Sequence, residues 1–282
     1  MCKRTELYRR KGAYTKKYIK DMFENALKGG IGKLYDAKVP LPNNSNKTSK
    51  LLNVVSNIQD CDRNIEDFLA EKILELGIKE HLEKYFKDKS VEIREAGYNA
   101  GHNPENIKFN KDSKRRENNI VRFLYKYKEE SIIKNTLGEI IDYEIPLTEG
   151  TKNNIDMLAI TDDCVNIIEW KTDSKSCSDS LLRAIMEITT YEYELDKETL
   201  IEDFELNKRG YNSKSFKKII AIFDNTRPAI TYRAILNEKK EVSKIAELLK
   251  TLDIKVILFS SGSIPKTITD ETKISDCEIN LA

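Results

Sequence analysis

Residues 154–171 read Asn-Ile-Asp-Met-Leu-Ala-Ile-Thr-Asp-Asp-Cys-Val-Asn-Ile-Ile-Glu-Trp-Lys, and the fold is best approached from this stretch. Two apolar runs, 154–161 and 164–171, flank Asp162-Asp163. Aspartate tolerates the backbone of a two-residue turn better than most residues, so the stretch predicts a β-hairpin. Both strands are apolar on both faces, which is typical of strands buried in a sheet that helices cover.

The register of this hairpin brings charged residues together. Thr161 opposes Cys164 across the turn, and counting outward sets Asp156 opposite Glu169, with Cβ atoms about 4.5–5.5 Å apart. Lys171 lies two residues beyond Glu169 and therefore points to the same face. Two adjacent carboxylates in apolar surroundings are costly without a counter-charge, and Mg²⁺, which prefers carboxylate oxygens, would provide one. The alternative is a Glu–Lys ion pair at the sheet end, with the aspartate solvated.

The remaining elements follow from the periodicity of apolar residues. A polar linker is expected over 41–46 and a loop-rich passage over 97–112. Late strands that alternate with a helix are typical of an α/β fold, whereas the early strands favour antiparallel pairing. We therefore expect a mostly helical, basic N-terminal region over 1–110 and a main domain over 111–282. The sequence predicts helices over 15–28, 62–87, 114–130, 178–195 and 238–251, and further strands over 137–147, 217–223 and 254–260.

Asp156, twelve further residues and then Glu169-Trp170-Lys171 resemble the D…(D/E)xK signature of the PD-(D/E)XK nuclease superfamily. The order helix, strand, hairpin, helix, strand over 114–223 also resembles that family's common core. Ile155 stands where the family has proline. The resemblance implies an α/β, restriction-endonuclease-like fold, with a mixed β-sheet flanked by helices.

The resemblance also implies a chemistry. Asp156, Glu169 and the backbone carbonyl of Trp170 would bind Mg²⁺, or Mn²⁺ as a substitute, and Lys171 would orient or deprotonate the attacking water. The implied function is hydrolysis of phosphodiester bonds in nucleic acid, with DNA preferred. Two alternatives stay open: a nuclease-fold module that binds nucleic acid or a protein partner without cleaving it, and an unrelated α/β protein with a surface ion network.

Residues on the flanking helices complete the candidate site. Glu117 precedes Ile120, Val121 and Leu124 on one helix face and is a candidate metal ligand, the alternative being a solvated acid in the first helical turn. Asp142 and Glu144 alternate with apolar neighbours in the 137–147 strand and are expected to point outward.

The helix after the hairpin carries Arg183, Glu187 and Tyr191 at intervals of four residues. The last two resemble the QxxxY motif of the RecB-like branch, with Glu in place of Gln. Glu187 would then act with Lys171, while Arg183, Lys175 and Tyr191 are candidate contacts to the substrate phosphate. An internal helix ion pair with a packed tyrosine is the alternative.

The composition argues against several classes of protein. The sequence has no run of about 18 uncharged apolar residues, so it predicts no membrane-spanning helix. The first residues are followed by charged residues and not by the apolar segment of a signal peptide. Five cysteines without a CxxC pair indicate the cytoplasm and no thiolate zinc site. Two histidines and no phosphate-binding glycine loop argue against His-dependent hydrolases and P-loop ATPases.

The formal net charge is only +1, but residues 1–50 hold thirteen Lys or Arg against four acidic residues. Basic residues interleaved with tyrosines can contact a phosphate backbone and stack on bases, so nucleic acid is the expected partner. A solvated helix face is the alternative. The oligomeric state is left open, with a dimer as one option.

Overall fold

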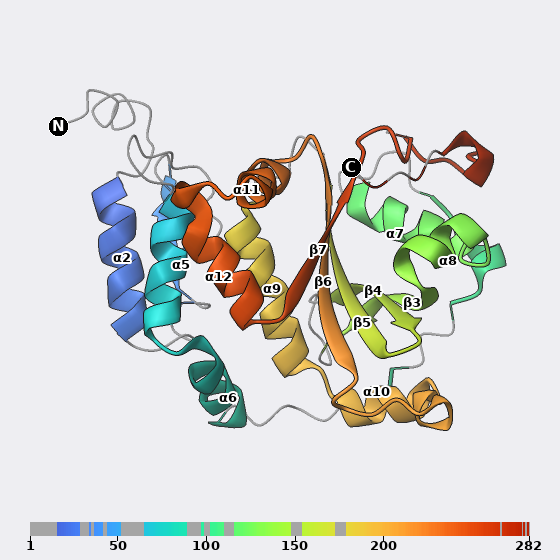
Figure 1. Ribbon diagram of the computed structural model, residues 1–282, viewed down its shortest axis with the longest axis horizontal. Helices are drawn as coiled ribbons and strands as arrows, with labels where there is room; N and C mark the ends of the chain where they lie inside the picture. The colour runs from blue at the N-terminus through green and yellow to red at the C-terminus, as the bar shows by residue number, and fades with distance from the viewer. Residues whose placement is uncertain are drawn as a thin grey trace. The chain divides into compact units, whose positions relative to one another are not determined.

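The computed structural model describes residues 16–28, 34, 37–41, 44–51, 65–88, 97–98, 102–109, 116–147, 154–172, 179–265, 267–277, 279 and 281. Its helices and strands are shown in Figure 1. The strands are β1 (Lys38–Leu41), β2 (Asn44–Lys50), β3 (Glu139–Pro146), β4 (Asn154–Thr161), β5 (Cys164–Lys171), β6 (Phe216–Phe223) and β7 (Ile254–Phe259). The α-helices are α2 (Lys16–Lys28), α5 (Ile65–Glu75), α6 (Ile78–Asp88), α7 (Arg116–Lys126), α8 (Ser131–Leu137), α9 (Leu181–Glu194), α10 (Lys197–Asp203), α11 (Arg227–Leu236) and α12 (Ser243–Thr251). None of these helices is both long and apolar enough to cross a membrane.

The chain forms two compact units that no single cut in the sequence separates. The first comprises residues 1–90, 178–186 and 231–252, and the second comprises 91–177, 187–230 and 253–282. This division differs from the single boundary that was expected near residue 110. That the nuclease-like domain begins there remains a prediction.

The second unit is built on a five-stranded mixed sheet in the order β3-β4-β5-β6-β7. The first three strands pair antiparallel, whereas β5 pairs parallel with β6 and β6 pairs parallel with β7. The predicted α/β class, with a mixed sheet flanked by helices, is confirmed.

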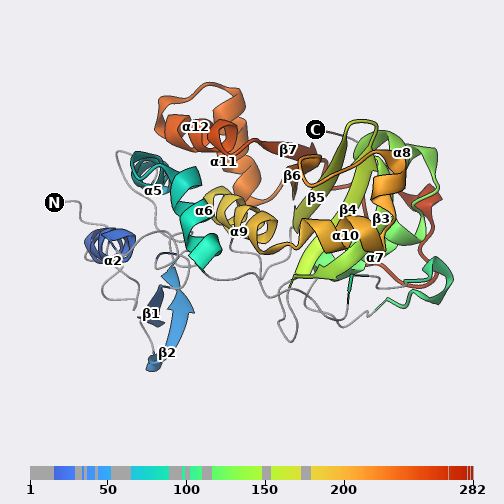
Figure 2. The ribbon, with the colours of Figure 1, turned by 90° about the horizontal axis from the view of Figure 1, so that it is seen from below.

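Helices cover both faces of this sheet. One face packs against α7 and α8 in a core that contains Phe123, Met157 and Trp170. The other face carries the odd-numbered residues of β5 and meets the second half of α9, where Lys171 contacts Glu187. In Figure 2, α9 lies on one side of the sheet and α7 and α8 lie on the other. Burial on both faces explains why the hairpin is apolar throughout.

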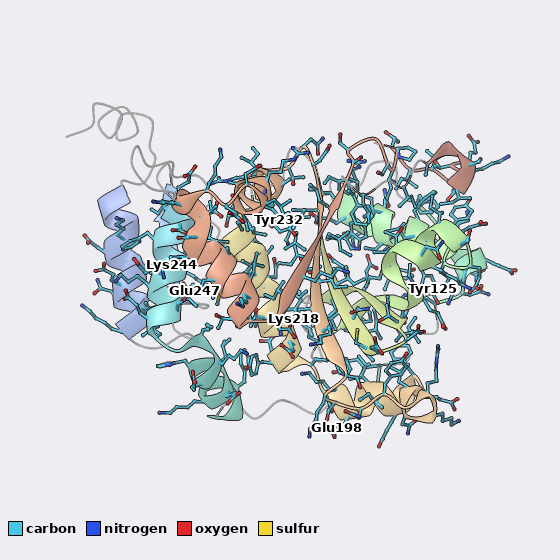
Figure 3. The ribbon with its side chains drawn as sticks, viewed as in Figure 1. Tyr125, Glu198, Lys218, Tyr232, Lys244 and Glu247 are labelled. Atoms are coloured by element: carbon cyan, nitrogen blue, oxygen red, sulfur yellow. The ribbon has the colours of Figure 1, made fainter. Side chains whose placement is uncertain are left out.

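In the first unit, α5 packs against α12. Asp67 of α5 caps α12, because its Oδ1 accepts hydrogen bonds from the backbone N–H groups of Lys244 (2.6 Å) and Ile245 (3.0 Å). Lys244 also forms an ion pair with Glu247 one turn later (2.7 Å; both are labelled in Figure 3). These contacts tie a helix from the C-terminal half of the sequence to one from the N-terminal half.

The hairpin follows the predicted bounds, and its pairing of Thr161 with Cys164 confirms the predicted turn. The expected strands over 137–147, 217–223 and 254–260 correspond to β3, β6 and β7. The expected helices over 15–28, 178–195 and 238–251 correspond to α2, α9 and α12, with bounds that differ by at most five residues.

Three expectations about elements were wrong, and two helices were missed. The helix expected over 62–87 is two helices, because Gly77 adopts a φ of 64° and its N–H caps α5 at Leu74. The helix expected over 114–130 ends at Lys126, and α8 follows it. Strands β1 and β2 pair antiparallel where a linker was expected over 41–46. Helices α10 and α11 were not expected at all.

The outward orientation expected for Asp142 was also wrong. The pairing of β3 with β4 shifts between Ile140 and Asp142, so the simple alternation of faces fails there. Asp142 is consequently 2% exposed and lies among buried neighbours.

Gly138 separates α8 from β3 and sets the entry into the sheet. Its φ of 89° and ψ of −168° suit glycine almost alone, and a Cβ there would lie 2.3 Å from the carbonyl oxygen of Ile160. Gly210 has a similar φ of 88°, but a Cβ at that position would meet no other atom within 4 Å.

We expect Gly138→Ala to lower the free energy of unfolding by at least about 2 kcal/mol, because strain and the clash with β4 add together. Gly210→Ala should cost only about 1 kcal/mol, the strain of the left-handed conformation. Urea unfolding monitored by circular dichroism measures both. Equal losses in the two variants would contradict the close approach of Gly138 to β4.

Candidate functional site

The charged residues of the hairpin meet where β5 ends and β4 begins. The ladder pairs Met157 with Ile168, and the same register, continued by one residue, sets Asp156 opposite Glu169. Lys171 follows on the same face of β5 as Glu169. The side chains of Glu169 and Lys171 are only 6% and 5% exposed. Glu169 and Lys171 therefore lie in a nearly closed environment, in which electrostatic interactions are stronger than in water, whereas Asp156 keeps partial exposure.

Lys171 lies between carboxylates from two elements. Its Nζ donates to Oε1 of Glu169 at 2.6 Å and to Oε2 of Glu187 on α9 at 2.8 Å. Tyr191, one turn further along α9, donates its hydroxyl to Oε1 of Glu187 (3.1 Å). Burial, together with the charge of Glu187, raises the pKa of the Tyr191 hydroxyl, which favours its role as a donor. The chain from Tyr191 through Glu187 holds the ammonium in place.

Asp156 is held by backbone rather than by a cation. Its Oδ2 accepts a hydrogen bond from the N–H of Trp170 at 2.8 Å. Burial raises the pKa of the Asp156 carboxyl to about 7, and the charges of Glu117 and Glu187 act in the same direction. The nearby Lys171 and the Trp170 N–H oppose this rise and are outweighed. Keeping this group ionised at neutral pH therefore lowers the stability of the folded protein.

Glu169 has an oxygen that its surroundings leave unsatisfied. Its Oε1 accepts from Lys171, whereas its Oε2 is buried and has no hydrogen-bond partner among the described residues. Burial and the neighbouring Asp156 raise the pKa of Glu169 well above its ordinary value. A buried acceptor without a partner costs about 1–3 kcal/mol, and more when charged, so this oxygen favours the approach of a cation or a donor.

Glu117 approaches the same end of β5 from the first turn of α7. Its Oε1 accepts a hydrogen bond from the hydroxyl of Thr172, at 3.4 Å, and Thr172 is fully buried directly after the strand. Glu117 is also close enough to raise the pKa of Asp156. Lys171 thus contacts Glu169 and Glu187, while Glu117 and Glu187 both act on the nearby Asp156.

The oxygen atoms of this cluster can be compared with the ligands that a divalent cation prefers. Among the described residues, no group of three or more histidine, cysteine, aspartate or glutamate side chains is arranged to hold a metal ion. Mg²⁺, however, is commonly bound through one or two carboxylates and keeps several water ligands. Asp156 and the unsatisfied oxygen of Glu169 are carboxylate donors of the kind that such an ion prefers. The part of the Trp170 backbone that the structure brings to Asp156 is its N–H, so a role for its carbonyl stays a prediction.

The three candidate phosphate contacts differ in position. Tyr191 belongs to the carboxylate cluster through Glu187. Arg183 lies two turns earlier on α9, in the segment assigned to the first unit, and forms an ion pair with Asp179. Lys175 lies outside the described residues. The phosphate role remains a prediction for all three.

Sequence reasoning missed a second polar cluster, on β3. Asp142 and His102 share a hydrogen bond through an Oδ1–Nδ1 contact of 2.7 Å, and His102 stacks on Tyr143 with ring centroids 4.1 Å apart. Tyr125 donates its hydroxyl to the backbone carbonyl of His102 (2.9 Å). No local signal reveals this pair, because the shift in strand register that buries Asp142 depends on the pairing partner.

The raised pKa of Asp156 predicts how stability depends on pH. An acid whose folded-state pKa exceeds its unfolded value of 3.8 costs nothing below that value, and its cost grows up to about pH 7. We expect Asp156→Asn to stabilise the metal-free protein by up to about 4 kcal/mol at pH 8 and by almost nothing at pH 4. Thermal unfolding at the two pH values, with EDTA present, measures this.

Asp162→Asn, which changes an exposed residue of the hairpin turn, is the matched control and should leave stability unchanged at both pH values. A pH-independent effect of Asp156→Asn would show that the carboxyl is not strained by its surroundings.

Comparisons of the chain with protein-family models, with curated proteins and with solved structures find no match. The geometry of this carboxylate–lysine cluster is therefore the basis on which a function is inferred.

Proposed function

We propose that this protein is a metal-dependent nuclease that hydrolyses phosphodiester bonds in nucleic acid, with DNA as the preferred substrate. One observation carries the proposal: the buried Oε2 of Glu169 has no partner among the described residues and lies beside Asp156, whose pKa is raised to about 7. Lys171 satisfies one oxygen of Glu169, and a further cation beside Oε2 would stabilise the pair. The resemblance to the PD-(D/E)XK superfamily and its restriction-endonuclease-like fold belongs to the same proposal.

The residues take distinct roles in this proposal. Asp156 and Glu169 hold Mg²⁺ or Mn²⁺, which supplies Lewis-acid polarisation of the phosphodiester and neutralises its charge. Lys171 presents an ammonium beside the carboxylates, where it orients the attacking water and the scissile phosphate. Glu187 positions Lys171 through their 2.8 Å contact, and Tyr191 positions Glu187. Water is the nucleophile, so no covalent intermediate with the protein forms.

The burial of the cluster separates this proposal from a surface ion network. Surface ion pairs are solvated and contribute little, typically about 0–1 kcal/mol. Glu169 and Lys171 are instead almost fully buried on a covered face of the sheet. Holding charged groups there destabilises the fold, and a catalytic role accounts for their presence.

The second candidate is a module that binds nucleic acid or a protein partner without cleavage. The observation that favours it is the lack, among the described residues, of a preassembled group of three metal-ligating side chains. The complete Asp156, Glu169 and Lys171 set favours the enzyme. Cleavage assays decide between the two.

We also propose that the protein works in the reducing environment of the cytoplasm. Cys164 and Cys277, the two described cysteines, are both free thiols. Free thiols persist where glutathione and thioredoxin keep cysteines reduced.

We expect the purified protein to cut DNA with Mg²⁺ or Mn²⁺, and to cut it poorly with Ca²⁺, whose longer and looser coordination positions water less well. Lys171→Met should reduce cleavage by at least about 100-fold, because the charge beside the scissile phosphate is removed. The variant should still be stabilised by Mg²⁺ in thermal unfolding, since lysine is not a ligand. A gel assay on plasmid, linear and single-stranded DNA and on RNA measures the cleavage.

Lys218→Met is the matched control for this variant. Lys218 is also a buried lysine of the sheet, but it forms an ion pair with Glu192 rather than with the hairpin carboxylates. It should retain cleavage under conditions where circular dichroism shows both variants folded. Cleavage by Lys171→Met at the wild-type rate would assign the activity to another site, and a wild-type protein that cuts no substrate would favour the binding module.

The basic N-terminal segment is proposed as a contact to nucleic acid. Residues 1–15 carry five Lys or Arg and one Glu. A deletion of residues 1–45 would also remove Phe23, Leu27 and Leu34, which are buried. A loss of binding in that variant could therefore reflect a loss of folding. The shorter segment is the part that can be tested.

We expect replacement of the five Lys and Arg of residues 1–15 by Gln to weaken DNA binding. The slope of log K against log salt should become shallower by about 0.9 for each phosphate that the segment no longer neutralises. Fluorescence anisotropy from low to moderate salt measures both quantities. Lys239→Gln with Lys240→Gln, at exposed positions elsewhere, is the control. An unchanged slope would favour the alternative, in which the segment is solvated and does not contact nucleic acid.

A further inference from the structure

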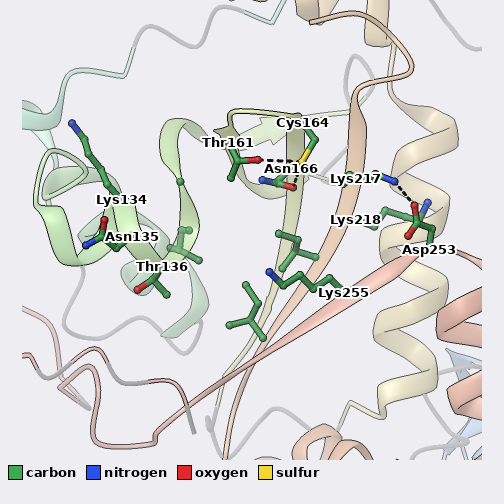
Figure 4. Close-up of a pocket in the computed structure, with 14 residues that line it drawn as sticks. Lys134, Asn135, Thr136, Thr161, Cys164, Asn166, Lys217, Lys218, Asp253 and Lys255 are labelled. Atoms are coloured by element: carbon green, nitrogen blue, oxygen red, sulfur yellow. Dashed lines mark hydrogen bonds and ion pairs between the residues drawn. The ribbon is translucent and has the colours of Figure 1, made fainter.

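A second polar site lies in the sheet unit, away from the carboxylates. It is a pocket of about 400 Å³ between the end of α8 and the first residues of β5, β6 and β7 (Figure 4). Its lining includes Asn166 of β5, Lys217 of β6 and Lys255 of β7, together with Thr136 of α8. Polar and basic side chains from four elements thus line it, together with the acid Asp253.

Asn166 provides a donor at the base of this pocket. The residue is only 4% exposed, and its Oδ1 accepts from the thiol of Cys164 at 3.4 Å. Figure 4 shows the amide nitrogen on the side away from Cys164. Within the described part of the chain this nitrogen has no hydrogen-bond partner, and it is not among the polar atoms sealed from solvent. A buried residue that offers an unused donor to a pocket favours a ligand with an acceptor.

Lys255 provides the charge. It forms no ion pair with the described residues, and Figure 4 shows its side chain running from β7 into the space between the strands and α8. Lys217 is the second cation, and its acidic partner, Asp253, is 69% exposed. A surface pair of this kind contributes about 0–1 kcal/mol, so Lys217 can exchange it for a ligand at little cost.

The size and the remaining lining indicate more than a bare anion. Pockets of about 300–1,000 Å³ hold ligands the size of a drug molecule. The apolar side chains of Leu137, Ile219 and Ile257 also line the pocket. A ligand that combines a phosphate, for the two lysines and the amide, with an apolar group fits this lining.

The geometry of β5 separates this pocket from the carboxylate cluster. Asn166 and Glu169 are three residues apart, which is about 10 Å along a strand, and side chains at odd and even positions point to opposite faces. Asn166 shares the face of Ile168 and Trp170, which α7 and α8 cover. A ligand in the pocket consequently lies on the other side of the sheet from Asp156.

We propose that this pocket binds a phosphomonoester of nucleotide size, such as a nucleoside monophosphate, through Asn166, Lys217 and Lys255. The site is independent of the proposed nuclease function, because none of its residues belongs to the carboxylate cluster.

Isothermal titration with AMP, inorganic phosphate and adenosine, in EDTA, tests the proposal. AMP should bind most tightly, phosphate weakly and adenosine not measurably, because the phosphate is the anchor. Lys255→Gln should weaken AMP binding about tenfold, and Asn166→Asp should abolish it, because a carboxylate replaces the donor. Lys214→Gln, at an exposed position that does not line the pocket, should bind AMP as the wild type does.

A second measurement keeps the test valid if Asn166→Asp fails to fold. AMP should protect Cys164, which lines the pocket and is partly exposed, from alkylation in the wild-type protein, as mapped by peptide mass spectrometry. The Asp156→Asn protein should bind AMP normally, so failure of this proposal is distinguishable from failure of the nuclease proposal. Lack of AMP binding, equal binding of adenosine, or an unaffected Lys255→Gln variant would overturn it. Binding of a single-stranded oligonucleotide without binding of AMP would overturn it in favour of a backbone contact.

Discussion

The pairing of β4 with β5 places Asp156 and Glu169 against each other, and the geometry of the candidate site depends on that register. Side chains alternate along a strand, so a slip of one residue would turn one carboxylate to the opposite face. The same register brings the Trp170 N–H to Asp156, while Lys171 lies beside Glu169 because both are on one face of β5. One local pairing thus sets the position of Asp156 against both Glu169 and Trp170, and the two-residue turn at the other end of the hairpin sets the pairing.

The helices on the two faces of the sheet then determine how costly the charges are. With α9 on one face and α7 on the other, the end of β5 is nearly closed to solvent. Desolvation favours the neutral forms of Asp156 and Glu169, and it also strengthens the attraction between Lys171 and its two carboxylate partners. The balance leaves Oε2 of Glu169 unsatisfied among the described residues, and the proposed cation follows from this imbalance.

Strand β5 contributes to both proposed sites because its faces differ. Its odd-numbered residues carry the carboxylate and the lysine toward α9, and its even-numbered residues include Asn166 on the face of α7 and α8. The parallel neighbours β6 and β7 begin beside Asn166, which brings Lys217 and Lys255 to its end of the sheet. The hairpin carboxylates and the lysines of the pocket therefore lie at opposite ends and on opposite faces of the sheet.

Local sequence was enough to predict the hairpin, its turn and its register, because all three depend on residues within an eighteen-residue stretch. It also predicted the strands β3, β6 and β7 and the side-by-side position of the hairpin charges. Other features arise only from tertiary packing. The burial of Asp142 depends on a shift in pairing with β4, and the bridge from Lys171 to Glu187 depends on how α9 packs against the sheet. The unsatisfied Oε2 of Glu169 and the convergence of donors around Asn166 likewise require elements that are far apart in the chain, and local patterns of hydrophobicity and charge hold no information about such encounters.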